Sequence, residues 1–168
     1  GLSPSSHPTQ VLSDIFTIQE IKKKSISKLK LCWIGDANNN MMNSLIEACI
    51  KFSVSLNIAC PKDYQPNKAL ITLIKKQKGK IKIFNKKEKA VKNSDVVMTD
   101  KIISLNDKVN KKKKLKSFKN FKVDTKTMNL AKKDAIFLHC LPRGNEVTEE
   151  VFLGKKSKVW QQALNRVY

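Results

Sequence analysis

Three short polar segments carry the side chains of this 168-residue chain that are best suited to chemistry. Cys140 follows an apolar run and precedes Leu141 and Pro142, so we expect its thiol at the exit of a buried strand. Asp100 also ends an apolar run, where a carboxylate can pair with the ammonium group of a ligand. Residues 35–40 end a third run with three asparagines, whose amides can bind a carboxylate or an amine. Each segment alone is equally typical of a structural turn, a helix cap or a buried cysteine.

A fourth candidate lies at the start of a predicted helix, where the sequence reads His7-Pro8-Thr9-Gln10. The first turn of a helix has free N–H groups and the positive end of the helix dipole. It therefore suits an anionic or carbonyl-bearing ligand, to which His7 and Gln10 can add donors. The simpler interpretation is an ordinary helix start that happens to contain a histidine.

Alternating strands and helices must position these segments. Strands are predicted at 29–34, 54–60, 80–84, 94–99, 135–139 and 157–160, and helices at 8–24, 41–52, 66–78, 86–93, 125–132 and 147–153. Residues 101–122 are rich in lysine and are predicted to be irregular, whereas Asp124 can cap the helix that follows them. Such alternation predicts a three-layer, Rossmann-like α/β domain with a mostly parallel sheet of about five strands, flanked by helices. Ligands of such sheets bind beyond the carboxyl ends of the strands, where the polar segments should converge.

The net charge of +20 raises the possibility of a nucleic-acid-binding or other anion-binding module. However, the lysines are scattered along the chain, and aromatic residues make up only 7% of it. Only two of the 34 basic residues are arginine, namely Arg143 and Arg166. The pattern therefore favours a general compositional bias toward lysine over a specific nucleic-acid site.

Composition also bears on metals, membranes and compartment. The four cysteines form no CxxC pair and there are only two histidines, so we expect no metal site and no cofactor. No apolar run approaches the roughly 20 residues of a membrane span. Three of the cysteines, Cys32, Cys49 and Cys60, lie in apolar segments and are predicted to be buried thiols. These features favour a reducing, cytoplasmic-type compartment.

Taken in order, the motifs resemble the second, ornithine-binding domain of ornithine carbamoyltransferases along essentially the full chain. The matching segments are Gly1-Leu2-Ser3, His7-Pro8-Thr9-Gln10, Trp33-Ile34-Gly35-Asp36 with Asn39-Asn40, Ile58-Ala59-Cys60-Pro61-Lys62, Thr99-Asp100 with Ser104, His139-Cys140-Leu141-Pro142-Arg143, and Asn165-Arg166. Each motif is weak alone, but their order and spacing are specific. Aspartate carbamoyltransferases fit less well because they have His-Pro-Leu-Pro at 139–142. Specificity for putrescine or acetylornithine stays open.

The resemblance implies roles for individual residues. It places carbamoyl phosphate at His7, Gln10, Cys140 and Arg166, and ornithine at Asn39, Asn40, Asp100, Ser104, Leu105 and Leu141. Within these sets it implies catalytic roles for Cys140, Asp100 and Arg166. The implied partners are L-ornithine, carbamoyl phosphate and a separate carbamoyl-phosphate-binding domain, within a homotrimer.

Residues 1–168 are thus expected to form one amino-acid-binding domain. The family's phosphate-binding Ser-Thr-Arg-Thr segment and its terminal helix beyond Arg166 lie outside this sequence, so we expect little turnover from this domain alone. Two local departures also affect the resemblance. Ser104-Leu105-Asn106 replaces Ser-Met-Gly, and Leu164-Asn165-Arg166 replaces Glu-Asn-Arg. The alternative from another class is a non-catalytic, lysine-rich binding module.

Overall fold

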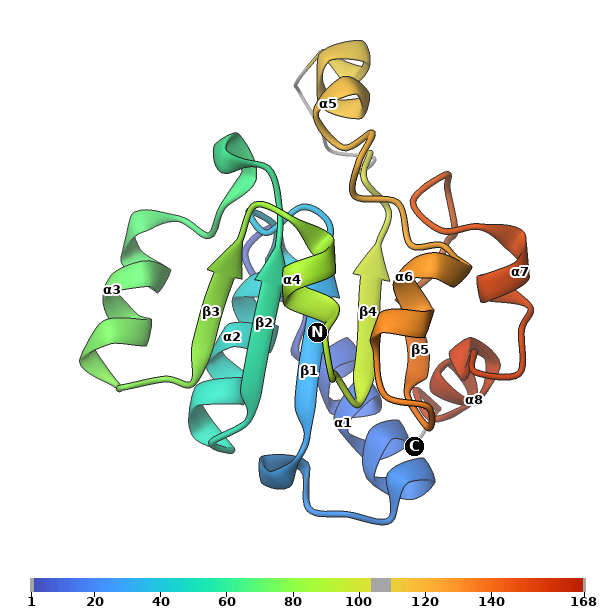
Figure 1. The fold of residues 1–168 in the computed structure, drawn as a ribbon. Helices are drawn as coiled ribbons and strands as arrows, with labels where there is room; N and C mark the ends of the chain where they lie inside the picture. The colour runs from blue at the N-terminus through green and yellow to red at the C-terminus, as the bar shows by residue number, and fades with distance from the viewer. Residues whose placement is uncertain (1, 104–109, 168) are drawn as a thin grey trace.

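A single parallel sheet forms the centre of the molecule (Figure 1). The computed structural model describes residues 2–103 and 110–167. The five strands are β1 (Lys30–Ile34), β2 (Ser55–Ala59), β3 (Ile81–Phe84), β4 (Val96–Asp100) and β5 (Ile136–Cys140). They lie in the order β3-β2-β1-β4-β5, and every neighbouring pair is parallel. The predicted α/β sheet is therefore confirmed.

Helices cover both faces of this sheet, as Figure 1 shows. They are α1 (Pro8–Lys22), α2 (Asn40–Lys51), α3 (Lys68–Lys76), α4 (Lys87–Val91), α5 (Lys111–Ser117), α6 (Thr125–Leu130), α7 (Glu149–Phe152) and α8 (Val159–Leu164), with short 3-10 turns η1 (Ile26–Lys28) and η2 (Lys62–Tyr64). Because successive strand residues face opposite sides, each strand supplies two separate cores. Leu31 and Trp33 of β1 enter the core with α1 and α2, whereas Cys32 and Ile34 enter the core with α4 and α6.

Local signals explain where several helices begin. Pro8 occupies the first turn of α1, where its missing N–H costs no hydrogen bond. The Asn39 side chain caps α2 by accepting a 2.8 Å hydrogen bond from the Met42 N–H. Asp124 caps α6 in the same way, accepting from the Thr127 N–H at 2.7 Å, which confirms its predicted role.

Two sequence predictions were wrong. Residues 157–160 do not form a strand: Ser157 makes only an isolated bridge to Phe137, and helix α8 begins at Val159. Residues 101–122 are not wholly irregular either, because they contain α5. The lysine-rich sequence of this helix shows no apolar stripe. The helix is attached to the rest of the domain through Lys114, whose buried ammonium lies 2.6 Å from an Asp36 carboxylate oxygen.

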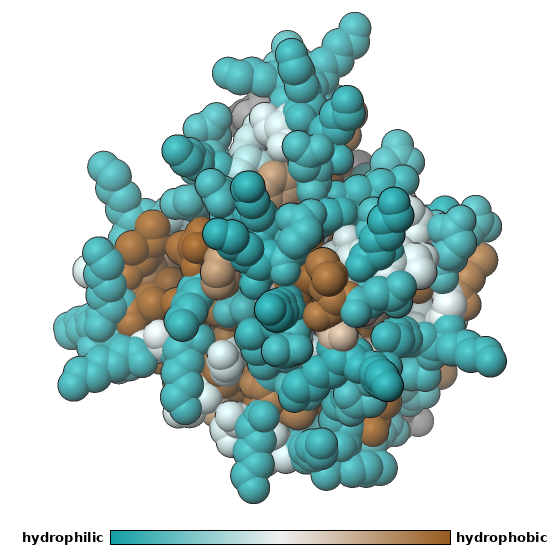
Figure 2. All heavy atoms as spheres, in the orientation of Figure 1, coloured by the Kyte–Doolittle hydropathy of each residue, from teal (hydrophilic) through white to brown (hydrophobic). Residues whose placement is uncertain are grey.

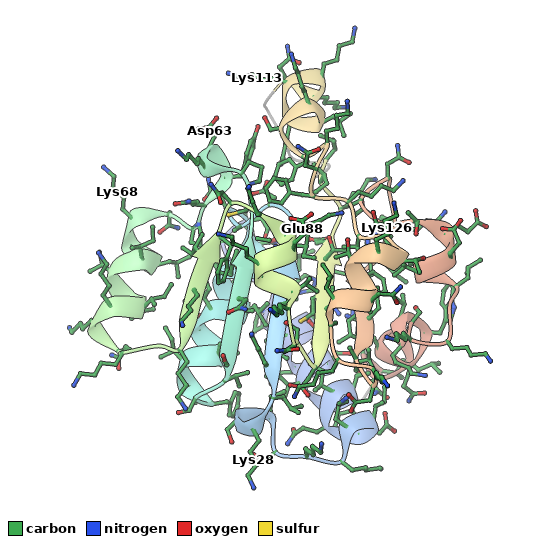
Figure 3. All side chains as sticks on the ribbon, in the orientation of Figure 1. Lys28, Asp63, Lys68, Glu88, Lys113 and Lys126 are labelled. Atoms are coloured by element: carbon green, nitrogen blue, oxygen red, sulfur yellow. The ribbon has the colours of Figure 1, made fainter. Side chains whose placement is uncertain are left out.

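The positive charge is spread over the surface. Figure 2 shows hydrophilic side chains across the visible face, with smaller hydrophobic areas between them. In Figure 3, Lys28, Lys68, Lys113 and Lys126 project outward from four different segments. Within the described ranges, no helix is long and apolar enough to cross a membrane. These four lysines thus lie on separate segments, in keeping with the scatter of lysines along the sequence.

Candidate functional site

The carboxyl ends of β1, β4 and β5 are neighbours, and these ends carry the three predicted polar segments. β4 lies between β1 and β5 in the sheet. Asp100 and Cys140 are the last residues of β4 and β5 and are paired across the two strands. Directly paired residues of neighbouring strands point to the same face, which here is the face covered by α1 and α2. The predicted convergence at one edge of the sheet is therefore confirmed for these segments.

The environment of Asp100 and Cys140 favours neutral forms. Burial raises the pKa of Asp100 to about 6, although the Lys101 N–H donates to its Oδ1 at 2.6 Å. Burial also raises the pKa of the Cys140 thiol, and the carboxylates of Asp100 and Asp14 raise it further. Cys140 is therefore a protonated thiol at neutral pH, suited to hydrogen bonding rather than to thiolate attack. This agrees with a role in orienting an amine.

The start of α1 lies on the same side of the sheet. The His7 N–H donates to the Ser44 hydroxyl at 2.9 Å, which attaches this turn to α2. Burial and the nearby Arg166 guanidinium lower the pKa of His7, so its ring is neutral at pH 7. Gln10 is buried, and its amide nitrogen donates to Asp14 at 2.8 Å. His7 and Gln10 thus provide uncharged polar groups at this side of the sheet.

Asp36 organises the asparagine turn after β1. Its Oδ1 accepts from the Asn38 N–H at 2.8 Å, and its Oδ2 pairs with Lys114. The Asn39 amide donates to the Asp36 carbonyl at 3.2 Å in addition to capping α2. The Asn40 amide donates to the Ser3 carbonyl at 2.9 Å. Asn39 and Asn40 therefore lie at the expected edge of the sheet, but their amides already make intramolecular contacts.

A buried His139–Glu146 pair fixes the loop after β5, and sequence reasoning did not include it in the site. His139 faces away from Cys140, and its Nε2 lies 2.7 Å from Glu146 Oε1. The Gly144 N–H donates to the same oxygen at 2.6 Å. Burial alone would raise the pKa of Glu146, but these hydrogen bonds lower it below its usual value. An acidic residue soon after the His-Cys-Leu-Pro motif was the available signal.

Helix α8 brings Arg166 close to the same region. A small crevice is lined by Gln10, His139, Leu141, Val159, Gln162, Ala163 and Arg166. Leu141 and Arg166 thus line one crevice with Gln10. Arg143, the other arginine, instead stacks on Phe152 with its guanidinium carbon 4.8 Å from the ring centre. Ser104 and Leu105 lie outside the described residues, so their predicted contacts with ornithine stay predictions.

Comparisons with known proteins agree on the kind of domain. The model of the "Aspartate/ornithine carbamoyltransferase, Asp/Orn binding domain" matches residues 27–168. The ornithine carbamoyltransferase of Methanocorpusculum labreanum is 39% identical over 170 residues, covering 100% of this chain and 55% of that protein. The chain thus spans about half the length of the curated relatives that it matches.

Solved structures give the same result. The anabolic ornithine carbamoyltransferase of Campylobacter jejuni is 41% identical, with a TM-score of 0.91 covering 99% of this chain and 57% of that one. The ornithine carbamoyltransferase of Pyrococcus furiosus is 37% identical, with a TM-score of 0.89 covering 99% and 55%. The chain therefore belongs to the aspartate/ornithine carbamoyltransferase family, in which it matches the Asp/Orn-binding domain.

Proposed function

We propose that this chain is the ornithine-binding part of an ornithine carbamoyltransferase, which converts carbamoyl phosphate and L-ornithine into L-citrulline and phosphate. The observation that carries the proposal is the pairing of Asp100 with Cys140 at the edge of the sheet. The Asp100 carboxylate can bind the δ-amine of ornithine, and the neutral thiol of Cys140 beside it can orient that amine. The names of the relatives support ornithine as the amino acid.

The reaction requires the δ-amine of ornithine to lose a proton. Desolvation in a closed cleft lowers the pKa of an amine, and the neutral amine can then attack the carbamoyl carbon. The new N–C bond gives a tetrahedral intermediate, whose oxygen His7 and Arg166 stabilise as donors. The C–O bond to phosphate then breaks, and phosphate leaves with the electron pair. The first proton passes to solvent before the attack, and the second proton, which the nitrogen loses as the intermediate collapses, can pass to the departing phosphate.

Most of the rate enhancement should come from holding the two substrates in line, for which effective molarities of about 10⁵–10⁸ M are possible. Asp100 and Cys140 hold the amine with Leu141 beside them, and Gln10 holds the carbamoyl group. The phosphate requires a second domain, since the family's Ser-Thr-Arg-Thr segment lies outside this sequence. We propose that this second domain also forms the contacts of a homotrimer.

Isothermal titration calorimetry with the purified chain tests the proposal. We expect saturable heat with L-ornithine, alone or together with carbamoyl phosphate. Putrescine lacks the α-carboxylate, acetylornithine has a blocked α-amine, and aspartate lacks the δ-amine, so each should bind at least about tenfold more weakly, the value of one lost polar contact. Equal binding of putrescine and ornithine, or no binding of ornithine under either condition, would contradict the proposed specificity.

A further inference from the structure

We propose that Asp14 is a positioning residue that fixes the orientation of the Gln10 carboxamide and so selects a carbamoyl group over an acyl group of the same size. This inference rests on the proposed function, in which Gln10 contacts the carbamoyl group of the substrate. Asp14 lies one helical turn after Gln10 on α1 and is completely buried. Sequence reasoning did not single it out.

One oxygen of Asp14 joins three elements around the site. Its Oδ1 accepts from the Gln10 Nε2 at 2.8 Å and from the Gln162 Nε2 of α8 at 2.5 Å. The Oε1 of Gln162 in turn accepts from the His139 N–H at 3.1 Å. The carboxylate therefore connects the start of α1, the helix that precedes Arg166 and the strand that ends at Cys140.

The hydrogen-bond pattern determines which atom Gln10 offers to a ligand. An oxygen that receives two amide donors acts as an acceptor, so Gln10 must turn its NH₂ group toward Asp14. Its Oε1 then points away from Asp14, and Gln10 lines the crevice shared with Leu141 and Arg166. A carbonyl oxygen accepts hydrogen bonds, and the NH₂ of a carbamoyl group can donate one. A methyl group in the same place cannot.

The other oxygen of Asp14 indicates that packing alone does not explain this residue. Among the described residues, Asp14 Oδ2 is buried and has no hydrogen-bond partner. Burial, helped by the charge of Asp100 and opposed by Gln10, Gln162 and Arg166, raises the pKa of Asp14 to about 7 in total. A buried carboxyl group in this state costs stability, which an apolar residue of similar volume would not. The orientation of Gln10 is a function of Asp14 that would offset this cost.

A matched pair of stable phosphonates tests the proposal by NMR titration of the full chain. Phosphonoacetamide carries the NH₂ group, and acetonylphosphonate carries a methyl group in its place. The chain should prefer the amide by about tenfold. Asp14→Ala should reduce that preference to less than twofold, by weakening binding of the amide and leaving binding of the methyl compound unchanged. A merely structural role would weaken both equally.

Two further variants complete the comparison. Asp14→Asn keeps an accepting Oδ1 and should retain most of the preference. Thr17→Val is the control, because Thr17 is equally buried on α1 and accepts from Asn165 of the α8 end without touching Gln10. It should retain the full preference. Loss of the preference in Thr17→Val, or its survival in Asp14→Ala, would overturn the inference while leaving the proposed function intact.

A measurement on the unaltered chain keeps the test valid if Asp14→Ala does not fold. The side-chain amide protons of Gln10 should exchange slowly and should shift as Asp14 titrates near pH 7. Fast exchange without such a shift would overturn the inference. If the unaltered chain does not bind ornithine, the proposed function itself fails, whereas binding of ornithine without binding of phosphonoacetamide contradicts only the role given to Asp14. Equal binding of the two phosphonates would also contradict only that role.

Discussion

The two ends of the sheet contain buried aspartates in opposite electrostatic situations. Asp95 precedes β4 at the amino end, where its Oδ1 accepts from Lys132 at 2.7 Å and its Oδ2 from the Lys30 N–H at 2.9 Å. Asp100 ends the same strand at the carboxyl end, and Asp14 lies nearby on α1. Their pKa values are raised to about 6 and about 7, because burial is incompletely compensated.

This difference in partners separates an aspartate that stabilises the fold from aspartates that can still gain from binding a ligand. A carboxylate with a cation and a backbone donor has nothing further to gain from a bound molecule. Carboxylates whose ionised form is disfavoured can still gain from an added positive charge. Perturbed groups of this kind concentrate at functional sites. The comparison therefore locates the site at the end of β4 that carries Asp100.

The largest effect is expected when the Asp100 carboxylate, which we propose binds the δ-ammonium of ornithine, is neutralised. Asp100→Asn should weaken ornithine binding by about a hundredfold, because a buried ion pair with the δ-ammonium loses one partner. The fold should lose little, since the ionised carboxylate is already disfavoured there. Calorimetry measures the affinity and urea unfolding measures the stability. Unchanged ornithine affinity in Asp100→Asn would contradict the proposal that ornithine binds at the carboxyl end of β4.

The opposite result is expected at the amino end. Asp95→Ala leaves the Lys30 N–H and the Lys132 ammonium without their acceptor and should lower the free energy of unfolding by about 2 kcal/mol. Ornithine affinity should stay within twofold, which makes this variant the control for Asp100→Asn. Urea denaturation measures the change in stability. A stable Asp95→Ala variant that loses ornithine would reverse the assignment of the two ends.

Asp14 predicts a pH effect of known sign. Because folding raises its pKa, its stabilising contribution is complete below about pH 4 and is lost as pH rises through about 7. Relative to Asp14→Asn, the unaltered chain should therefore lose about 1 kcal/mol or more between pH 4.5 and 8, since one pKa unit equals about 1.4 kcal/mol. Urea unfolding of both proteins at each pH measures this. A free energy of unfolding that rises with pH in the unaltered chain relative to Asp14→Asn would contradict the raised pKa.

The smallest effect concerns Asn39, which lies at the ligand end but caps a helix. Asn39→Ala should lower the free energy of unfolding by about 1 kcal/mol, through loss of the hydrogen bond to the Met42 N–H. Asn39→Asp keeps the cap and should restore most of that stability. Thermal unfolding of the two variants separates the cap from any contact with ornithine. Equal stability of both variants would mean that the cap contributes nothing.

Sequence patterns predicted the sheet because strands such as β1 and β5 are mostly apolar and end at clear turns. Parallel topology then required that the ends holding Asp100 and Cys140 share one edge. The prediction failed at 157–160, where Val159 and Trp160 are residue types common in strands. There Ser157 forms only a bridge, and α8 forms instead, with Gln162 hydrogen-bonded to Asp14.

The sequence did not allow us to predict which side chains contact one another across the fold. Asp14 and Glu146 were not among the predicted site residues, and only the fold shows them buried beside Gln10 and His139. Helix α5 was missed for a related reason. Its position depends on Lys114 reaching Asp36, a contact between segments nearly eighty residues apart that no local pattern contains.

The most direct test of the account is an NMR titration with L-ornithine that follows both ends of β4 at once. We predict saturable shifts of the signals of Asp100, Cys140 and Asn40, with those of Asp95 and Lys132 unchanged. Shifts confined to Asp95 and Lys132, or no saturable shift at Asp100 and Cys140, would contradict the claim that this edge of the sheet binds the amino acid.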